Sequence, residues 1–202
     1  MNDLARLTGV ETPAVLLDLA KLEQNLEAMQ QLADAYGVAL RPHAKTHKSI
    51  EIARRQLGHG AVGLTVATVG EALVFLKSGI RSITISRPMV SSGSFDRLLQ
   101  EPVAREADLR IVVDSQRGVE IAQEKATDCE LGVFIKVDVG LHRCGVDPDS
   151  AAAVELAQQI DGAPNLDFRG IFSHAGQVYA VEERRAAVEI AEVERTTMLR
   201  VR

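Results

Sequence analysis

Residues 61–86 read AVGLTVATVGEALVFLKSGIRSITIS, and this stretch decides the fold class. It opens with a short apolar run that predicts a buried strand. Thr68 and Glu71 then have the spacing of a capping box at the start of a helix, and Gly79 follows that helix as its stop signal. A second apolar run, over 82–86, predicts another strand. Strand, helix and strand in this order indicate a βαβ unit with parallel strands.

The same alternation continues on both sides of this stretch. After a first extended run over 13–18 and a helix with Asp18 as its N-cap, we expect six strands, at 39–45, 61–67, 82–86, 109–114, 131–138 and 166–174. Each strand is followed by a helical pattern, and the last helix covers 181–202. No Gly-x-Gly-x-x-Gly directly follows the first expected strand, so an open dinucleotide-binding sheet is not favoured. A closed (β/α) barrel needs eight strand–helix units, and about six are expected here.

Composition excludes several classes of partner. The chain has 202 residues, of which 46% are hydrophobic and 25% charged, and its net charge is −5. A mildly acidic protein has no general attraction for nucleic acid or anionic membranes. No apolar run approaches the roughly 18 residues that span a bilayer, and the N-terminus lacks a secretion-signal pattern. Cys129 and Cys144 show no disulfide framework, which favours a reducing cytoplasm.

The end of the expected strand 39–45 is strongly basic. Strand alternation places Arg41, His43 and Lys45 on one face. Working residues of α/β proteins lie at the carboxyl ends of strands, and a lysine among cations in a dry site becomes an amine that attacks aldehydes. The alternative is that Lys45 lies beyond the strand and is simply solvated. The residues by themselves leave these two interpretations about equally weighted.

The expected strand 131–138 runs into a short loop with glycines at both ends. Gly140 and Gly145 bracket it, and such a loop can bring Arg143 close to a phenolate or carboxylate. A surface arginine is the alternative. On the strand itself, Lys136 and Asp138 share a face and could form an ion pair.

The last expected strand ends at His174, followed by Ala175 and Gly176. A histidine in this place could act as an acid–base group, a metal ligand or a stacking partner, and a structural role is the alternative. Cys144 has no activating neighbours in the sequence, and His43 and His47 are not expected to form a metal pair.

These segments together resemble a known family. The sequence carries, in this order, Thr12–Asp18 (TPAVLLD), Arg41–Lys48 (RPHAKTHK), Ala67–Ala72 (ATVGEA), Lys136–Val146 (KVDVGLHRCGV) and Gly170–Gly176 (GIFSHAG). The set resembles the D-threonine aldolase and D-serine dehydratase-like family, which shares its N-terminal barrel with alanine racemase. The Pro-His-x-Lys-Thr element is the most specific piece.

The resemblance implies a fold type III pyridoxal 5′-phosphate enzyme built on a (β/α)8 TIM-type barrel. Lys45 matches the lysine that carries the cofactor as a Schiff base. Arg143 matches the arginine near its phenolic oxygen, and His174 matches the histidine near its pyridine ring. The whole chain, 1–202, is then one cofactor-binding barrel domain, truncated after about six units and without the family's C-terminal β domain.

The resemblance also implies the chemistry and the partners. We expect a lyase that acts on a D-amino acid, as an aldolase or a dehydratase. A divalent metal, Mn or Zn, is expected in full-length members, with no ligand assigned in this chain, and a homodimer is expected at full length. The alternatives are a racemase, a non-catalytic barrel that binds the cofactor, and an inactive fragment. A racemase needs a second base, usually a tyrosine from the other domain, and neither Tyr36 nor Tyr179 is obviously placed for that role.

Overall fold

A computed structural model describes residues 9–201, which fall into two compact units. The first unit ends at Ala39 and contains one helix, α1 (Leu19–Ala35). The expected cap of this helix is confirmed, because the Asp18 carboxylate accepts a hydrogen bond from the backbone N–H of Lys21 at 3.1 Å. The second unit begins at Leu40 and contains all the other elements.

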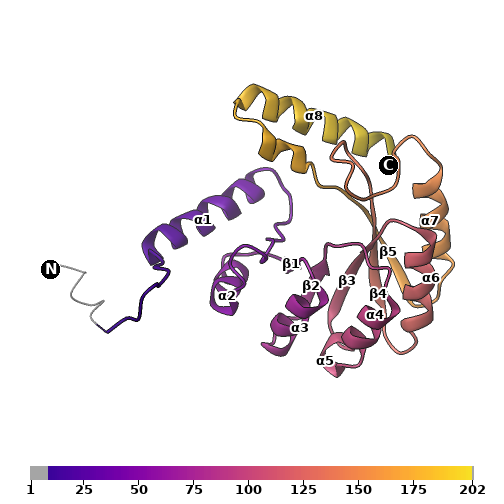
Figure 1. Cartoon of the computed structure of the whole chain (residues 1–202), viewed down its shortest axis with the longest axis horizontal. Helices are drawn as coiled ribbons and strands as arrows, with labels where there is room; N and C mark the ends of the chain where they lie inside the picture. The colour runs from indigo at the N-terminus through magenta and orange to yellow at the C-terminus, as the bar shows by residue number, and fades with distance from the viewer. Residues whose placement is uncertain (1–8, 202) are drawn as a thin grey trace. The chain divides into compact units, whose positions relative to one another are not determined.

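The second unit is built on a five-stranded parallel sheet whose strands lie side by side in chain order (Figure 1). The strands are β1 (Leu64–Val66), β2 (Ser82–Ile85), β3 (Asp108–Val113), β4 (Leu131–Lys136) and β5 (Leu166–Phe172). This arrangement confirms the α/β class and the parallel sheet. The described residues therefore supply five of the eight strands that a complete barrel contains.

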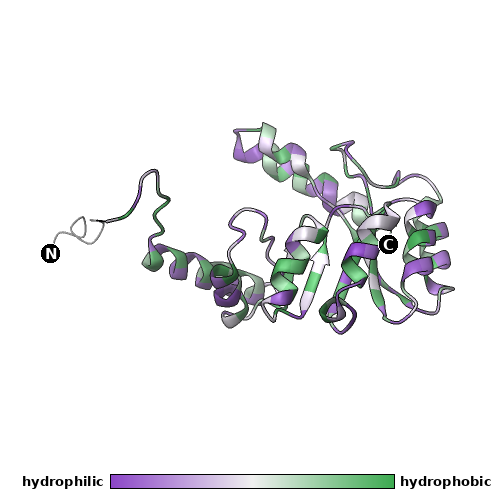
Figure 2. Cartoon of the chain, turned by 60° about the horizontal axis from the view of Figure 1, so that its bottom comes forward, coloured by the Kyte–Doolittle hydropathy of each residue, from purple (hydrophilic) through white to green (hydrophobic). Residues whose placement is uncertain are grey.

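In the second unit, helices precede β1, connect the successive strands and follow β5. They are α2 (Ile50–Gly58), α3 (Val69–Lys77), α4 (Ser92–Leu99), α5 (Pro102–Arg105), α6 (Gln116–Lys125), α7 (Ala152–Asp161) and α8 (Arg184–Val201), with the 3₁₀ helix η2 (Gly176–Ala180) before the last. Figure 2 shows hydrophobic residues along the strands and both hydrophobic and hydrophilic residues on the helices. Such two-sided helices bury their apolar stripe against the sheet.

Two helix starts follow the capping rules that the sequence suggested. At α3 the Thr68 hydroxyl accepts from the Glu71 N–H at 3.3 Å, and the Glu71 carboxylate accepts from the N–H of Ala67, the residue before the cap, at 2.7 Å. At α6 the Ser115 hydroxyl accepts from the N–H of Gly118 at 3.3 Å. These caps satisfy amide groups that a helix start leaves without partners.

The strand expected at 39–45 is wrong, because it reduces to a single bridge between His43 and Thr65. Pro42 lacks an N–H, and only its carbonyl pairs, accepting from Thr65. Beyond His43 the chain turns at once, since the N–H of Lys48 bonds back to the carbonyl of Ala44 at 2.8 Å. The segment thus runs beside β1 but leaves it to form a turn at the carboxyl end.

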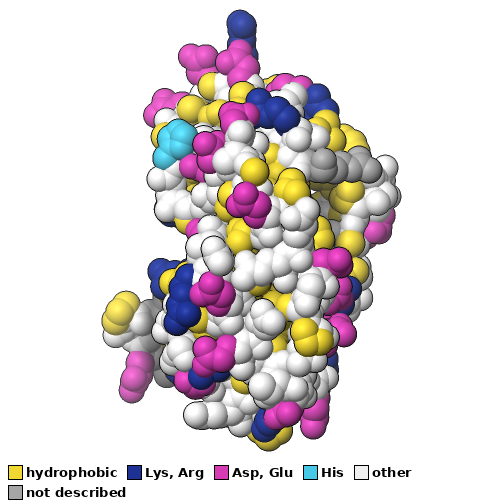
Figure 3. Space-filling model, turned by 90° about the vertical axis from the view of Figure 1, so that its right-hand side faces the viewer, with side chains coloured by type: hydrophobic (Ala, Val, Ile, Leu, Met, Phe, Trp, Pro, Cys, Tyr) yellow, Lys and Arg dark blue, Asp and Glu magenta, His cyan; other side chains and the backbone are white. Residues whose placement is uncertain are grey.

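The core lies between the sheet and its helices. Its largest fully buried side chains come from strands and helices alike, and include Phe75, Phe95, Leu98, Leu109, Ile111 and Ile135. On the face shown in Figure 3, acidic and basic side chains are interspersed. Within residues 9–201, every helix is too short or too polar to cross a membrane.

Candidate functional site

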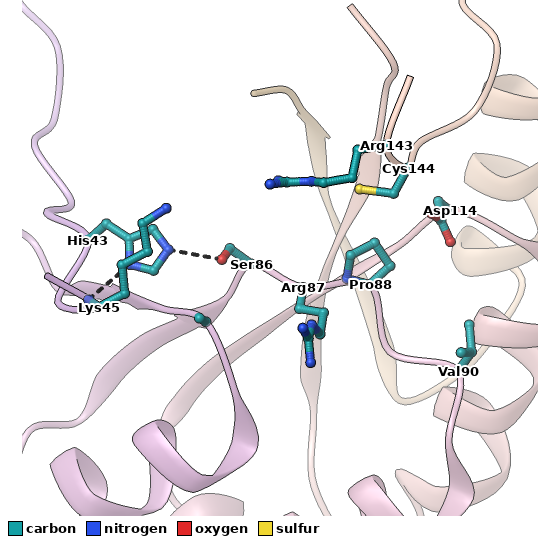
Figure 4. A pocket seen from close by; sticks show the side chains of 10 residues that line it. His43, Lys45, Ser86, Arg87, Pro88, Val90, Asp114, Arg143 and Cys144 are labelled. Carbon is teal, nitrogen blue, oxygen red and sulfur yellow. Dashed lines mark hydrogen bonds between the residues drawn. The ribbon is translucent and has the colours of Figure 1, made fainter. Parts of the chain in front are cut away.

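A cavity of about 470 Å³ opens at the carboxyl ends of the first strands of the sheet (Figure 4). Its lining comes from the turn after the bridge, from residues directly after β1, β2 and β3, and from the loop after β4. The lining residues are His43, Lys45, Ala67, Ser86, Arg87, Pro88, Val90, Asp114, Arg143 and Cys144. The volume lies in the range of small-molecule sites, and the place is where α/β folds bind ligands.

Lys45 stands at one edge of this cavity, in the turn that follows the His43–Thr65 bridge. The turn is fixed on β1, since the N–H of Ala44 donates to the Thr65 carbonyl at 2.8 Å. The Lys45 side chain is exposed, and its ammonium has no hydrogen-bond or ion-pair partner within residues 9–201. The structure therefore places the predicted anchor lysine in an accessible position beside a ligand-sized cavity.

The expected cluster of three basic side chains is split by the structure. His43 and Lys45 both line the cavity. Arg41 instead donates to the Ser82 hydroxyl at 2.9 Å and lies 3.8 Å from the Asp108 carboxylate. Ser82 and Asp108 are the first residues of β2 and β3, so Arg41 belongs to the amino end of the sheet.

Arg143 faces the same cavity from the loop after β4, and that loop is shaped by Asp138. One Asp138 oxygen accepts from the N–H groups of Gly140 and His142, both at 3.0 Å, and the other lies 2.9 Å from His142 Nδ1. Although desolvation acts against it, these hydrogen bonds lower the pKa of Asp138. The Arg143 guanidinium is exposed and has no hydrogen-bond or ion-pair partner among the described residues.

A second carboxylate holds the far end of the loop. Asp114, directly after β3, accepts from the N–H of Gly145 at 3.1 Å. Gly145 has a φ of +117°, and a Cβ there would lie 2.6 Å from the backbone nitrogen of Asp138. Gly140 also has a positive φ, of +110°. The tight loop predicted from these two glycines is confirmed.

The ion pair that Lys136 and Asp138 could form is not made in the structure, because Asp138 is engaged by the loop after it. Lys136 is 3% exposed, and its ammonium lies 4.4 Å from the centre of the Phe172 ring. Burial lowers the pKa of Lys136, and the Arg143 charge acts in the same direction. The buried end of β4 thus carries a lysine held by an aromatic ring rather than by a carboxylate.

His174 lies outside the cavity that Lys45 and Arg143 share. It lines a neighbouring hollow of about 350 Å³ with Tyr179, and the two ring centres are 6.1 Å apart. Burial lowers the pKa of His174, and the positive charges of Arg143, Lys136 and Lys45 lower it further. The imidazole is therefore within the electrostatic influence of the cavity without being one of its walls.

Sequence reasoning missed Ser86 and Asp114, which line the cavity. Each is the first residue after a parallel strand, β2 or β3, and this position was the available signal. No group of three or more His, Cys, Asp or Glu side chains within residues 9–201 is arranged to bind a metal ion. Cys129 and Cys144 are both free thiols.

The arrangement is suited to an anion that also carries an aldehyde. Three cationic side chains without a hydrogen-bond or ion-pair partner among the described residues, Lys45, Arg87 and Arg143, border one cavity. A lysine amine can bond covalently to a carbonyl carbon, and a guanidinium binds phenolate or carboxylate oxygens through paired N–H groups.

Comparisons with known proteins found a matching family model and similar proteins. Residues 17–199 match the family model described as alanine racemase, N-terminal domain. The chain is 42% identical over 186 residues to a D-threonine aldolase of Arthrobacter sp., which covers 90% of this chain and 48% of that protein.

Solved structures give the same result. The crystal structure of D-threonine aldolase from Filomicrobium marinum superposes with a TM-score of 0.89 at 33% identity, covering 95% of this chain and 52% of that one. D-threo-3-hydroxyaspartate dehydratase from Delftia sp. HT23 gives a TM-score of 0.88 at 31% identity, with coverage of 96% and 52%. The chain thus spans about half the length of the relatives it matches.

Proposed function

The chain belongs to the alanine racemase N-terminal domain family, and from this premise we propose that it binds pyridoxal 5′-phosphate through Lys45 as part of a lyase acting on D-amino acids. The observation that carries the proposal is the pairing of Lys45 and Arg143 on one cavity, both without partners among the described residues. The similarity to a D-threonine aldolase and a D-threo-3-hydroxyaspartate dehydratase supports the reaction class.

The residues present fit this cofactor. Pyridoxal phosphate is an anionic aldehyde, and the cavity offers an accessible amine and a guanidinium. Lys45 would hold it covalently and Arg143 would bind its phenolic oxygen, whereas His174, which the family resemblance assigns to its pyridine ring, lines the neighbouring hollow. When bound, the cofactor supplies an electron sink that stabilises negative charge at the Cα of an amino acid.

The chain's own groups have distinct tasks in this proposal. The Lys45 amine, when free, can accept a proton at Nζ. Arg143 supplies a guanidinium beside the cavity that can bind an anionic oxygen through paired N–H groups. Burial and the neighbouring cations lower the pKa of His174, so its ring is neutral near pH 7 and can stack or accept a hydrogen bond.

The substrate class proposed is a D-amino acid with a β-hydroxyl group. Cleavage of its Cα–Cβ bond would make the protein an aldolase, and loss of the hydroxyl would make it a dehydratase. A divalent metal, Mn or Zn, and a homodimeric state are proposed for the full-length family context, with metal ligands outside the described residues.

Covalent trapping tests the anchor. The protein would be mixed with pyridoxal phosphate, reduced with borohydride, digested, and analysed by mass spectrometry. We expect the pyridoxyl group on the Lys45 peptide and its loss in Lys45→Ala, with Lys21, which is 79% exposed, reporting non-specific labelling. Labelling of Lys45 no greater than that of Lys21 would contradict the proposal.

Product analysis separates the reaction classes. With added Mn²⁺ or Zn²⁺, glycine from D-threonine identifies an aldolase, and pyruvate from D-serine identifies a dehydratase. Conversion of D-alanine to L-alanine would favour the racemase alternative instead. A Lys45 adduct without any turnover would favour a cofactor-binding protein without catalysis.

A further inference from the structure

His43 has both ring nitrogens engaged at the edge of the cavity. The N–H of Lys45 donates to His43 Nδ1 at 3.3 Å, and His43 Nε2 lies 3.2 Å from the Ser86 hydroxyl (Figure 4). The Ser86 hydroxyl in turn donates to the Val66 carbonyl at 3.0 Å. A main-chain amide, an imidazole, a hydroxyl and a strand carbonyl therefore form one continuous chain.

The hydrogen bonds of this chain determine where the ring proton lies. A serine hydroxyl has one hydrogen, and Ser86 gives it to Val66, so Ser86 must accept from His43. His43 Nε2 therefore carries the proton, and in the neutral ring Nδ1 is left as an acceptor. That acceptor is what the Lys45 N–H requires.

The surroundings keep the ring in this neutral form. Burial lowers the pKa of His43, and the nearby charges of Lys45 and His174 lower it further, against an opposing contribution from Glu71. With neither nitrogen free, His43 has no site for exchanging a proton with a ligand. The role of His43 must therefore lie in holding the Lys45 main chain, whose N–H bonds to Nδ1.

We propose that His43 is a positioning residue for Lys45: Nδ1 holds the Lys45 main chain while Nε2–H ties the same ring to Ser86 after β2. The Lys45 side chain then starts from a fixed point at the cavity edge. This inference rests on the proposed function, because it assigns His43 a part in presenting the amine that carries the cofactor.

Two substitutions separate the ring's two hydrogen bonds. Asn at position 43 keeps an acceptor that can bond the N–H two residues ahead, as in an Asx turn. Gln at position 43 can reach Ser86 but is too long for that turn. His43→Asn therefore retains the bond to Lys45, and His43→Gln retains only the one to Ser86.

The test measures reductive trapping of pyridoxal phosphate at Lys45, relative to Lys21, in the full chain and in both variants. Amide hydrogen exchange at the Lys45 N–H and thermal melting are recorded alongside. We expect His43→Asn to keep the protection of the amide and nearly the wild-type trapping rate. We expect His43→Gln to lose that protection and to trap roughly fivefold more slowly, the effect of one ordinary hydrogen bond.

Equal trapping in wild type and both variants, with similar melting, would overturn the role of His43 alone. No Lys45 adduct in the wild type would overturn the proposed function and, with it, this role. Ser86→Ala provides an independent measurement that leaves His43 in place. It should increase the share of the Nδ1–H tautomer seen in ¹⁵N spectra of His43 and slow trapping, and an unchanged tautomer would contradict the inference.

Discussion

At Gly145 the chain passes too close to its own backbone for any side chain. The left-handed φ of +117° and the 2.6 Å approach of an added Cβ to the Asp138 nitrogen are separate obstacles. The loop that carries Arg143 depends on this residue, because the Gly145 N–H is bound by Asp114.

Gly145→Ala should therefore destabilise the protein more than Gly170→Ala. Gly170 has nearly the same φ, +113°, but open space where its Cβ would be. We expect about 1–3 kcal/mol of lost unfolding free energy from the backbone conformation in both variants. In Gly145→Ala the clash of the added Cβ should cause an additional loss. Urea denaturation measures the unfolding free energy of both variants. Equal losses would show that the backbone contact is relieved without cost.

The neighbouring cations should be visible in the titration of His174. Because Arg143 and Lys136 both lower the pKa of His174, Arg143→Gln and Lys136→Met should each raise it. The larger rise is expected for Arg143→Gln, since its charge has the stronger effect. NMR titration of the imidazole measures both changes. A fall in the His174 pKa in either variant would contradict the electrostatic link between this residue and the cavity.

Among single residues, the sequence identified Lys45 and Arg143 as neighbours of one site, and the structure places both on one cavity. It grouped Arg41 with His43 and Lys45, because strand alternation predicts the face of a side chain but not its level along the strand. Arg41 lies at the amino end of the sheet, beside Ser82 and Asp108. The sequence also left open an ion pair between Lys136 and Asp138, since same-face spacing says nothing about the loop amides that engage Asp138.

At the scale of elements, local capping signals located most helices and missed one start. Asp147-Pro148 has the residue types of an N-cap and a first helical position and so predicts a helix start, but α7 begins at Ala152. The Asp147 carboxylate accepts from the N–H of Asp149 at 2.9 Å, and its carbonyl accepts from Ser150, so the pair forms a turn instead. Asp followed by Pro is compatible with a helix start and with a turn, and the residues after the pair decide which of the two forms. The short helices α5 and η2 carry no apolar periodicity and were not expected.

The α3 cap can be tested against a helix start that lacks one. Thr68→Ala removes the hydroxyl that accepts from Glu71 and should cost about 1 kcal/mol of stability. Ser91 occupies the same position at α4 but makes no side-chain cap bond. Ser91→Ala should then be close to neutral in the same urea measurement. A loss in Ser91→Ala as large as that in Thr68→Ala would show that the capping bond is not the cause.

At the scale of the whole molecule, the partly buried histidines make stability depend on pH. Burial lowers the pKa values of His43, His47 and His174 in the folded protein. The unfolded chain therefore binds protons first as pH falls below about 6.5, which favours unfolding. The stabilising contribution is complete above that pH and is lost as pH falls through the folded pKa values.

We accordingly expect a lower unfolding free energy at pH 5.5 than at pH 7.5, measured with urea. The carboxylates with lowered pKa values, Glu71, Asp108 and Asp138, titrate below this window and cannot account for the change. Stability that is equal or higher at pH 5.5 would contradict the lowered histidine pKa values.

The overall α/β class could be read from the sequence because strand and helix patterns alternate with clear punctuation. The cavity could not, because it is formed by residues from separate segments that meet only when parallel strands place their carboxyl ends together. Ser86 and Asp114 show this, since neither belongs to a recognisable local motif.

The mode of attachment of Lys45 has an entropic consequence. Its main chain is bound to His43, while its side chain is exposed and has no partner within residues 9–201. The four-carbon arm therefore keeps its rotamer freedom, worth up to about 2 kcal/mol, until a ligand is captured. Capture must offset this ordering through contacts made elsewhere, and Arg143 is the cation across the cavity that can supply them.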